Sequence, residues 1–134
     1  MPFTAIYCAI NTFLALKEKP ACNVILSGGE FHADNTLFIP IGAHSILDDL
    51  CPTLAFISAA GIDSEQGASC YTCYNLNELA MKHHAMLRSR QRILVADSSK
   101  FDKVLPARIA ELRRFDLLVS DKMHRSRSWR WRRG

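Results

Sequence analysis

Short, continuous apolar runs separated by polar stretches dominate this chain of 134 residues. Such runs, rich in β-formers and bounded by turn-forming residues, are typical of buried strands. They predict strands at residues 2–8, 23–27, 35–39, 53–58, 92–96 and 116–120. Apolar residues at helical spacing predict the longest helix at 76–90, and shorter helices are expected at 12–19, 43–50 and 109–114. The polar stretch at 61–75 is predicted to be a loop.

The alternation of strand and helix indicates the fold class. Strands that are apolar throughout, rather than at every second position, belong to parallel sheets that are covered on both faces. The pattern therefore predicts an α/β domain, with a mostly parallel sheet and helices on both faces. Because ligands bind outside the carboxyl ends of the strands in such sheets, we expect any site among the residues that follow the strands.

Two of these strand ends carry glycine. Gly28 and Gly29 follow the strand at 23–27, where they either form a tight turn or let the backbone approach a phosphate or sugar. Residues 61–63 (Gly-Ile-Asp) follow the strand at 53–58. Their aspartate either caps a local turn or accepts hydrogen bonds from sugar hydroxyls.

The third strand end carries the strongest combination of groups. Asp97 and Lys100 enclose two serines directly after the strand at 92–96. The lysine and the hydroxyls suit an anion such as phosphate. A solvated loop capped by the aspartate is the simpler interpretation, and an aspartate–lysine pair that moves protons is a third.

The cysteines and histidines indicate neither a cofactor nor a metal site. Five cysteines at irregular spacing argue against a disulfide framework and favour reduced thiols in the cytoplasm. Cys70 and Cys73 form a lone C-x-x-C, whereas structural zinc needs four ligands. His83 and His84 are adjacent, so they point about 100° apart on a helix and make a poor ligand pair.

The positive charge of the chain is concentrated at its end. The formal net charge is +4, from 17 basic and 13 acidic residues, but six of the basic residues lie within 122–134. Residues 1–121 therefore hold 11 basic and 13 acidic residues, a net charge of −2. The Arg- and Trp-rich tail either binds nucleic acid or an anionic membrane surface, or is a disordered terminus without a role, which we favour. No apolar run approaches the roughly 18–20 residues that cross a bilayer.

Several of these segments together resemble a known family. The motifs NVILSGGEFHADNTLF, LAFISAAGIDSEQGASC, NLNELAMKHHAM, ILVADSSKF and RFDLLVSD are similar to the C-terminal effector domain of DeoR-type bacterial transcriptional repressors. The resemblance covers residues 1–121 and implies a Rossmann-like sheet similar to ribose-5-phosphate isomerase A and CoA-transferase-like folds. It implies a cytoplasmic sensor rather than an enzyme, and a phosphorylated sugar as inducer, with deoxyribose 5-phosphate favoured. A sugar-phosphate isomerase-like enzyme is the alternative.

The same resemblance assigns site residues and partners. It places near the ligand Asn11, Gly28, Gly29, Gly61, Ile62, Asp63, Glu78, Lys82, Asp97 and Lys100. Operator DNA is expected to bind only through an N-terminal head, which is absent here, as is the family's Gly-Thr-Thr phosphate loop. The chain is thus expected to be an incomplete effector domain at 1–121, followed by a non-native tail at 122–134. Exposed sheet edges and apolar surface then predict a homo-oligomer without membrane contact.

Overall fold

A computed structural model describes residues 3–7, 14–15, 17–18, 22–33, 37–39, 41, 46–70 and 76–121. The chain divides into two compact units, residues 1–49 and 50–134. The elements of the first unit are β1 (Phe3–Tyr7), β2 (Cys22–Leu26), β3 (Glu30–His32), β4 (Leu37–Ile39) and the 3-10 turn η1 (Ile46–Asp49). Those of the second are β5 (Leu54–Ser58), β6 (Gly61–Asp63), β7 (Gly67–Cys70), α2 (Leu76–Arg88), β8 (Gln91–Val95), η2 (Ser98–Lys100), β9 (Ala107–Ala110), η3 (Leu112–Arg114) and β10 (Leu117–Val119).

The first unit contains one parallel and one antiparallel pair of strands. β1 and β2 are parallel, with Ala5 opposite Val24, as expected for two apolar runs joined by a long connection. β3 and β4 form an antiparallel hairpin in which the Phe31 and Phe38 rings lie 5.1 Å apart. The sequence predicted β1, β2 and β4 but not β3. Of the predicted helix at 12–19, only residues 14–15 and 17–18 belong to the described part of the chain.

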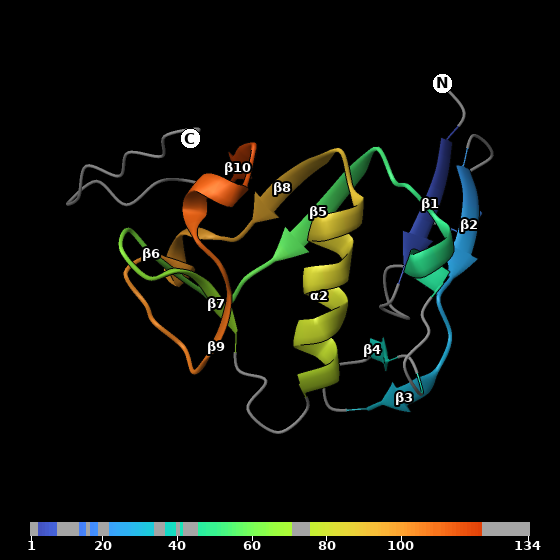
Figure 1. The fold of residues 1–134 in the computed structure, drawn as a ribbon, viewed down its shortest axis with the longest axis horizontal. Helices are drawn as coiled ribbons and strands as arrows, with labels where there is room; N and C mark the ends of the chain where they lie inside the picture. The colour runs from blue at the N-terminus through green and yellow to red at the C-terminus, as the bar shows by residue number, and fades with distance from the viewer. Residues whose placement is uncertain are drawn as a thin grey trace. The chain divides into compact units, whose positions relative to one another are not determined.

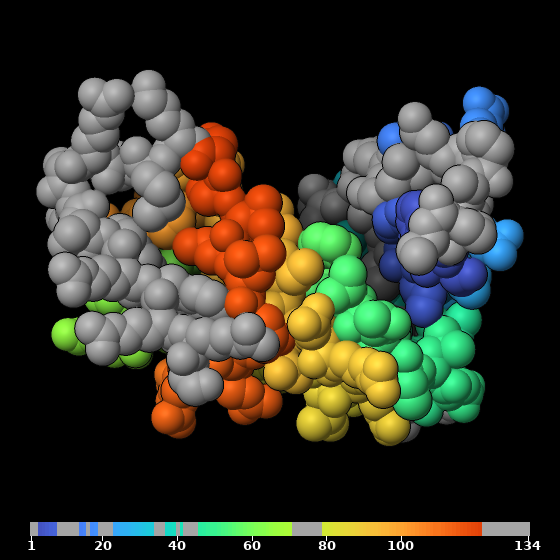
Figure 2. All heavy atoms as spheres, turned by 90° about the horizontal axis from the view of Figure 1, so that it is seen from above, coloured from blue at the N-terminus to red at the C-terminus, as the bar shows by residue number. Residues whose placement is uncertain are grey.

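The second unit is built on a three-stranded parallel sheet in the order β10-β8-β5. β8 lies between β5 and β10 (Figure 1). Its Ile93 lies opposite Phe56 of β5 and Leu117 of β10. In the space-filling view, the orange-red atoms around β10 lie directly against the gold atoms of β8 (Figure 2). All three strands were predicted, because each is a short, continuous apolar run.

The sequence predicted a loop at residues 61–75. Residues 61–63 and 67–70 instead form two strands of a second sheet. β6 and β7 pair antiparallel, and β7 also pairs with β9, giving the order β6-β7-β9. β9 occupies part of the segment predicted to be helical at 109–114, and only the 3-10 turn η3 follows it. Likewise, the helix predicted at 43–50 is described only as the 3-10 turn η1. The α/β class is correct, but the sheets are mixed rather than mostly parallel.

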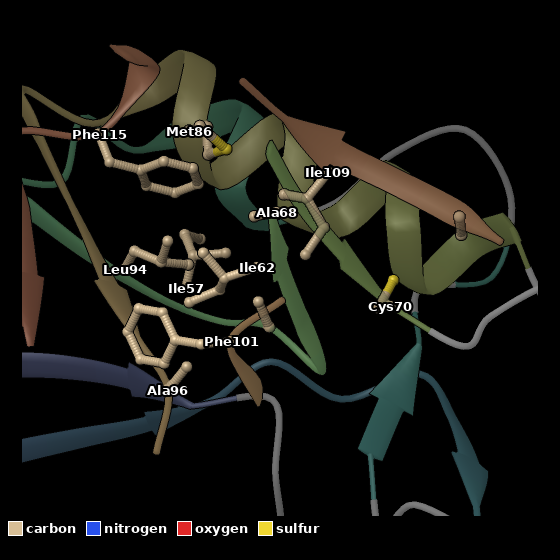
Figure 3. Packing of buried hydrophobic residues seen from close by; sticks show 12 residues of the cluster. Ile57, Ile62, Ala68, Cys70, Met86, Leu94, Ala96, Phe101, Ile109 and Phe115 are labelled. Carbon is tan, nitrogen blue, oxygen red and sulfur yellow. The ribbon is translucent and has the colours of Figure 1, made fainter. Parts of the chain in front are cut away.

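The core of the second unit lies between the two sheets and α2. Ile57 and Leu94 point from the parallel sheet toward Ile62 and Ile109 of the antiparallel sheet, and Met86 of α2 closes the cluster (Figure 3). Leu94 and Ile62 are completely buried. Burying a large aliphatic side chain contributes roughly 1.5–3 kcal/mol, so these contacts hold the parallel sheet against its covering layer.

The opposite face of the parallel sheet is apolar and open within the second unit. Its side chains alternate with those of the core and include Leu54, Phe56, Val95, Leu117 and Val119, all among the exposed large apolar residues. Phe56 is 66% exposed. Both connections that lead from β5 through β8 to β10 step in the same direction across the sheet. Right-handed crossovers therefore place both on the core face.

Candidate functional site: the carboxyl edge of the parallel sheet

The three parallel strands of the second unit end at one edge of the sheet, and a polar residue marks each end. Ser58 is the last residue of β5, Asp97 follows β8 by two residues, and Asp121 follows β10 by two residues. Val95 lies opposite both Ser58 and Val119, so these strand ends are level. Of the predicted site residues, Asp97 lies at this edge, whereas Gly28 and Gly29 lie in the first unit and residues 61–63 form β6.

Asp97 folds the segment that follows β8. Its carboxylate oxygen Oδ1 accepts hydrogen bonds from the backbone amide of Ser99, at 2.9 Å, and from the Ser99 hydroxyl. With extended backbone at Asp97, this is the N-cap of η2, and the Lys100 amide also donates to the Asp97 carbonyl at 3.1 Å. We call residues 97–100 the 97–100 loop.

These hydrogen bonds keep the Asp97 carboxylate ionised. Those from the Ser99 hydroxyl and then the Ser99 amide lower its pKa, and the charges of Lys100 and Lys103 add smaller effects in the same direction. Partial loss of hydration acts in the opposite direction. A carboxylate with a lowered pKa is a poor proton acceptor, so the geometry favours binding over proton transfer by the predicted aspartate–lysine pair.

Lys82 and Lys100 bring positive charge to the same edge. Lys100 is half-buried at the end of η2, close enough to Asp97 to influence its pKa. Lys82, on α2, donates from Nζ to the carbonyl oxygen of Ser58 at 2.8 Å. That hydrogen bond ties the helix to the end of β5 and places a second ammonium group at the carboxyl edge.

Residues 61–63 serve the fold, and Asp63 does so as the local turn cap that was one of its two predicted roles. The Ile62 side chain is completely buried, and its carbonyl oxygen accepts a hydrogen bond from the Asp102 amide at 2.7 Å. Asp63 caps the β6–β7 turn, where its Oδ2 accepts from the amides of Glu65 and Gln66 at 3.0 and 2.8 Å. A Cβ added at Gly61 would lie 2.7 Å from the Lys103 carbonyl oxygen, so this position needs glycine. These residues anchor the segment that follows Lys100.

Gly28 and Gly29 lie in the first unit, at the carboxyl end of β2. Both have positive φ, +72° and +112°, which glycine adopts without strain. No described residue lies within 4 Å of a Cβ added at Gly28, so packing against the described part of the chain does not require glycine there. Among the residues that the structure describes, the preceding Ser27 hydroxyl is buried without a hydrogen-bond partner. This end of β2 thus offers open backbone and an unused polar group.

Asp121 is the residue that sequence reasoning missed. Its Oδ1 accepts a hydrogen bond from the Ser98 amide at 2.7 Å, so it contacts the 97–100 loop from the neighbouring strand. The signal was present as a repeated motif, Leu-Val-Ala-Asp at 94–97 and Leu-Val-Ser-Asp at 118–121. In parallel strands with Val95 opposite Val119, the two aspartates of this motif end side by side.

Some predicted site residues cannot be placed. Asn11, Cys73 and the tail at 122–134 lie outside the described residues, as does the side chain of Glu78, although Glu78 itself belongs to α2. His83 is bonded through Nε2 to the carbonyl of Ile109, at 2.9 Å. Across the described ranges, no three His, Cys, Asp or Glu side chains gather as metal ligands would. None of the helices described in the structure is long and apolar enough to cross a membrane.

Comparison with known families assigns the chain to one of them. The model of the DeoR C-terminal sensor domain matches residues 1–122. The chain therefore belongs to the DeoR C-terminal sensor domain family, as its motifs predicted.

Individual relatives agree with this assignment. The chain is 54% identical over 121 residues to the deoxyribose operon repressor of Escherichia coli K12. The aligned region covers 90% of this chain and 47% of that repressor. It is 27% identical over 118 residues to the HTH-type transcriptional regulator GolR of Listeria innocua, covering 88% and 45% of the two chains. It is also 27% identical over 124 residues to the L-fucose operon activator of Haemophilus influenzae, covering 91% and 48%.

These relatives are regulators of transcription, which agrees with the prediction of a sensor rather than an enzyme. The chain spans about half the length of the relatives it matches.

Proposed function

We propose that this chain is the effector-binding part of a bacterial transcriptional repressor and that it binds a phosphorylated sugar, deoxyribose 5-phosphate. In the whole repressor, the sugar phosphate releases operator DNA, which a separate head holds. Such release requires the ligand to bind one conformation of the repressor more tightly than the other. Residues 1–121 form the effector domain in this proposal, and the protein acts in the cytoplasm.

The observation that carries the proposal is the 54% identity to a repressor of a deoxyribose operon. We infer from that name that the effector is a compound made from deoxyribose. The carboxyl edge of the parallel sheet supports this ligand class. There the ionised Asp97 suits sugar hydroxyls, and the ammonium groups of Lys82 and Lys100 suit an anion.

The homo-oligomer is a second part of the proposal. Its support is the open apolar face of the parallel sheet, which carries Phe56 and Leu117 at 66% and 50% exposure. Parallel sheets are covered on both faces, so contact with a second copy would bury this surface. Sedimentation of the chain and of Phe56→Ser tests this part. We expect an oligomer that Phe56→Ser weakens, and a monomeric wild type would refute it.

Thermal melting with deoxyribose 5-phosphate tests the ligand. A ligand at 100 times its Kd adds about 2.7 kcal/mol to stability, which raises the melting temperature by several degrees. Lys100→Ala should abolish this rise. Lys103→Ala, which removes the same charge from an exposed position, should keep most of it.

Two further comparisons complete the test. Deoxyribose without phosphate should give no rise, because it lacks the anion. If no pentose phosphate raises the melting temperature of the wild type, the proposed ligand class is wrong. If Lys100→Ala and Lys103→Ala respond as the wild type does, the ligand binds elsewhere.

A further inference from the structure

The 97–100 loop is fixed to its surroundings at both ends. At its far end, Phe101 is buried, and the Asp102 amide donates to the Ile62 carbonyl at 2.7 Å. At its near end, the Ser98 amide donates to Asp121 at 2.7 Å. Lys100 lies between these two attachments, so its backbone position depends on both.

The two aspartates at the near end do different work. Asp97 accepts from the next-but-one amide, that of Ser99, and this contact is local to the loop. Asp121 accepts from Ser98 across 23 residues of sequence. It is therefore the side chain that ties the first residue of η2 to a neighbouring strand. Hydrogen bonds from an amide to an ionised carboxylate are roughly twice as strong as neutral ones.

The sheet register makes this contact possible. β8 and β10 pair in parallel from Ile93 and Leu117 onward, and the ladder continues one residue beyond β8, where the Ala96 amide donates to the Val119 carbonyl at 3.2 Å. The next residues of both strands therefore stay level. Asp121 reaches Ser98 without any rearrangement of the backbone.

We propose that Asp121 is a positioning residue of the sensor site: by holding the Ser98 amide, it fixes the 97–100 loop and with it Lys100. This inference rests on the proposed function, in which Lys100 contacts the sugar phosphate. Asp121 itself need not touch the ligand. Loss of the Asp121 side chain loosens the 97–100 loop. Ligand binding must then also order the loop, which lowers the affinity.

Paired variants separate this role from a general loss of stability. Asp121→Ala removes the acceptor, and Asp121→Asn keeps an oxygen that accepts a hydrogen bond. Ser98→Pro removes the donor amide and, with it, the Ser98 hydroxyl. Proline suits this place because Ser98 is the first residue of η2 and Asp97 before it is extended, with φ −76° and ψ 167°. Ser98→Ala controls for the loss of the hydroxyl.

The first measurement needs no ligand. ¹⁵N relaxation of the full chain gives order parameters for the amides of Ser99 and Lys100, which report motion on the ps–ns timescale. We expect lower values in Asp121→Ala and Ser98→Pro, and values near the wild type in Asp121→Asn and Ser98→Ala. Unchanged values in Asp121→Ala would overturn the inference, whatever the ligand does.

The second measurement is the Kd for deoxyribose 5-phosphate by calorimetry. Asp121→Ala and Ser98→Pro should each weaken binding about tenfold, the effect of one hydrogen bond. The double variant should be no weaker than either single one, because both remove the same contact. Additive effects would overturn the inference. If the wild type does not bind while Asp121→Ala still loosens the loop, the proposed ligand is wrong and the attachment of the loop stands.

Discussion

Arg92 and Asp116 join β8 to the segment that leads into β10 through three contacts. The Arg92 amide donates to Oδ2 of Asp116 at 2.9 Å, the Asp116 amide donates to the Arg92 carbonyl at 2.8 Å, and the guanidinium lies 3.8 Å from the same carboxylate oxygen. The guanidinium also donates to the carbonyls of Arg114, at 2.9 Å, and Met86, at 3.2 Å. One side chain thus joins η3, the end of α2 and the parallel sheet.

Replacing this arginine should destabilise the second unit. Arg92→Met keeps the apolar stem but leaves the carbonyls of Arg114 and Met86 without their donor. We expect a loss of about 1–2 kcal/mol in the free energy of unfolding, measured with urea. Arg92→Lys should recover little, because an ammonium group cannot reproduce the planar donor fork. The exposed Arg90→Met is the matched control, and an equal loss there would contradict this assignment.

Two buried serine hydroxyls should respond differently to removal. Ser69 Oγ accepts from the Leu105 amide at 2.9 Å, so Ser69→Ala leaves that amide unsatisfied and should cost about 1–3 kcal/mol. Ser27 Oγ is buried without a partner in the described part of the chain, so Ser27→Ala should be neutral within about 0.5 kcal/mol or stabilising. Urea unfolding of the two variants measures the contrast. A large loss in Ser27→Ala would mean that this hydroxyl has a partner after all.

Two glycines with positive φ form a second matched pair. A Cβ at Gly67 would lie 2.2 Å from the Ala110 carbonyl oxygen, whereas one at Gly28 would meet nothing within 4 Å. Gly28→Ala should therefore cost only the left-handed backbone conformation, about 1–2 kcal/mol. Gly67→Ala adds a clash with β9 and should cost clearly more. Thermal unfolding compares them, and equal losses would show that β7 and β9 can move apart.

Acid should remove a contribution that Asp97 makes to stability. The Ser99 hydroxyl and amide lower the pKa of Asp97 in the folded protein, so folding favours its ionised form. This contribution is fully present above the pKa of the unfolded chain and is lost as the pH falls through the lower, folded pKa. The destabilisation caused by Asp97→Asn should therefore shrink between about pH 5 and pH 2. Urea unfolding over that range measures it.

The cause of the lowered pKa can be tested in the same way. In Ser99→Ala, the pKa of Asp97 measured by NMR titration should move toward its ordinary value, because the Ser99 hydroxyl makes the largest contribution to lowering it. Lys103→Ala should change the Asp97 pKa less, because the Lys103 charge makes the smallest contribution to lowering it. The reverse order would mean that charge rather than hydrogen bonding sets this pKa.

The parallel strands could be predicted because each is a short run of apolar residues that is visible in the local sequence. Residues 54–58 and 91–95 are apolar for most of their length, and few other elements give that pattern. The same reasoning put Asp97 and Lys100 at the carboxyl edge. It also carried the information for Asp121, whose Leu-Val-Ser-Asp motif repeats the end of β8.

The antiparallel sheet could not be predicted because contacts distant in sequence create it. β6 and β7 consist largely of small residues, and they are buried because Gly61 and Gly67 let other backbone segments approach. β9 has apolar residues at 107, 109 and 110, and with 112 these fit a helix as well as a strand. Its pairing with β7 decides between them. Ile62, which was predicted near the ligand, is completely buried in this sheet.

The 97–100 loop is folded by hydrogen bonds that belong to the protein itself, from Ser98 to Asp121 and from Ser99 to Asp97. When a loop must fold before the ligand can bind, the observed rate of binding levels off at high ligand concentration, because folding of the loop then limits the rate. For the proposed ligand at this edge, the observed association rate should instead keep rising in proportion to the ligand concentration. In the proposed sensor, the response to a rising ligand concentration would then not wait for this loop to fold, and the lifetime of the bound state would be set by how slowly the ligand dissociates.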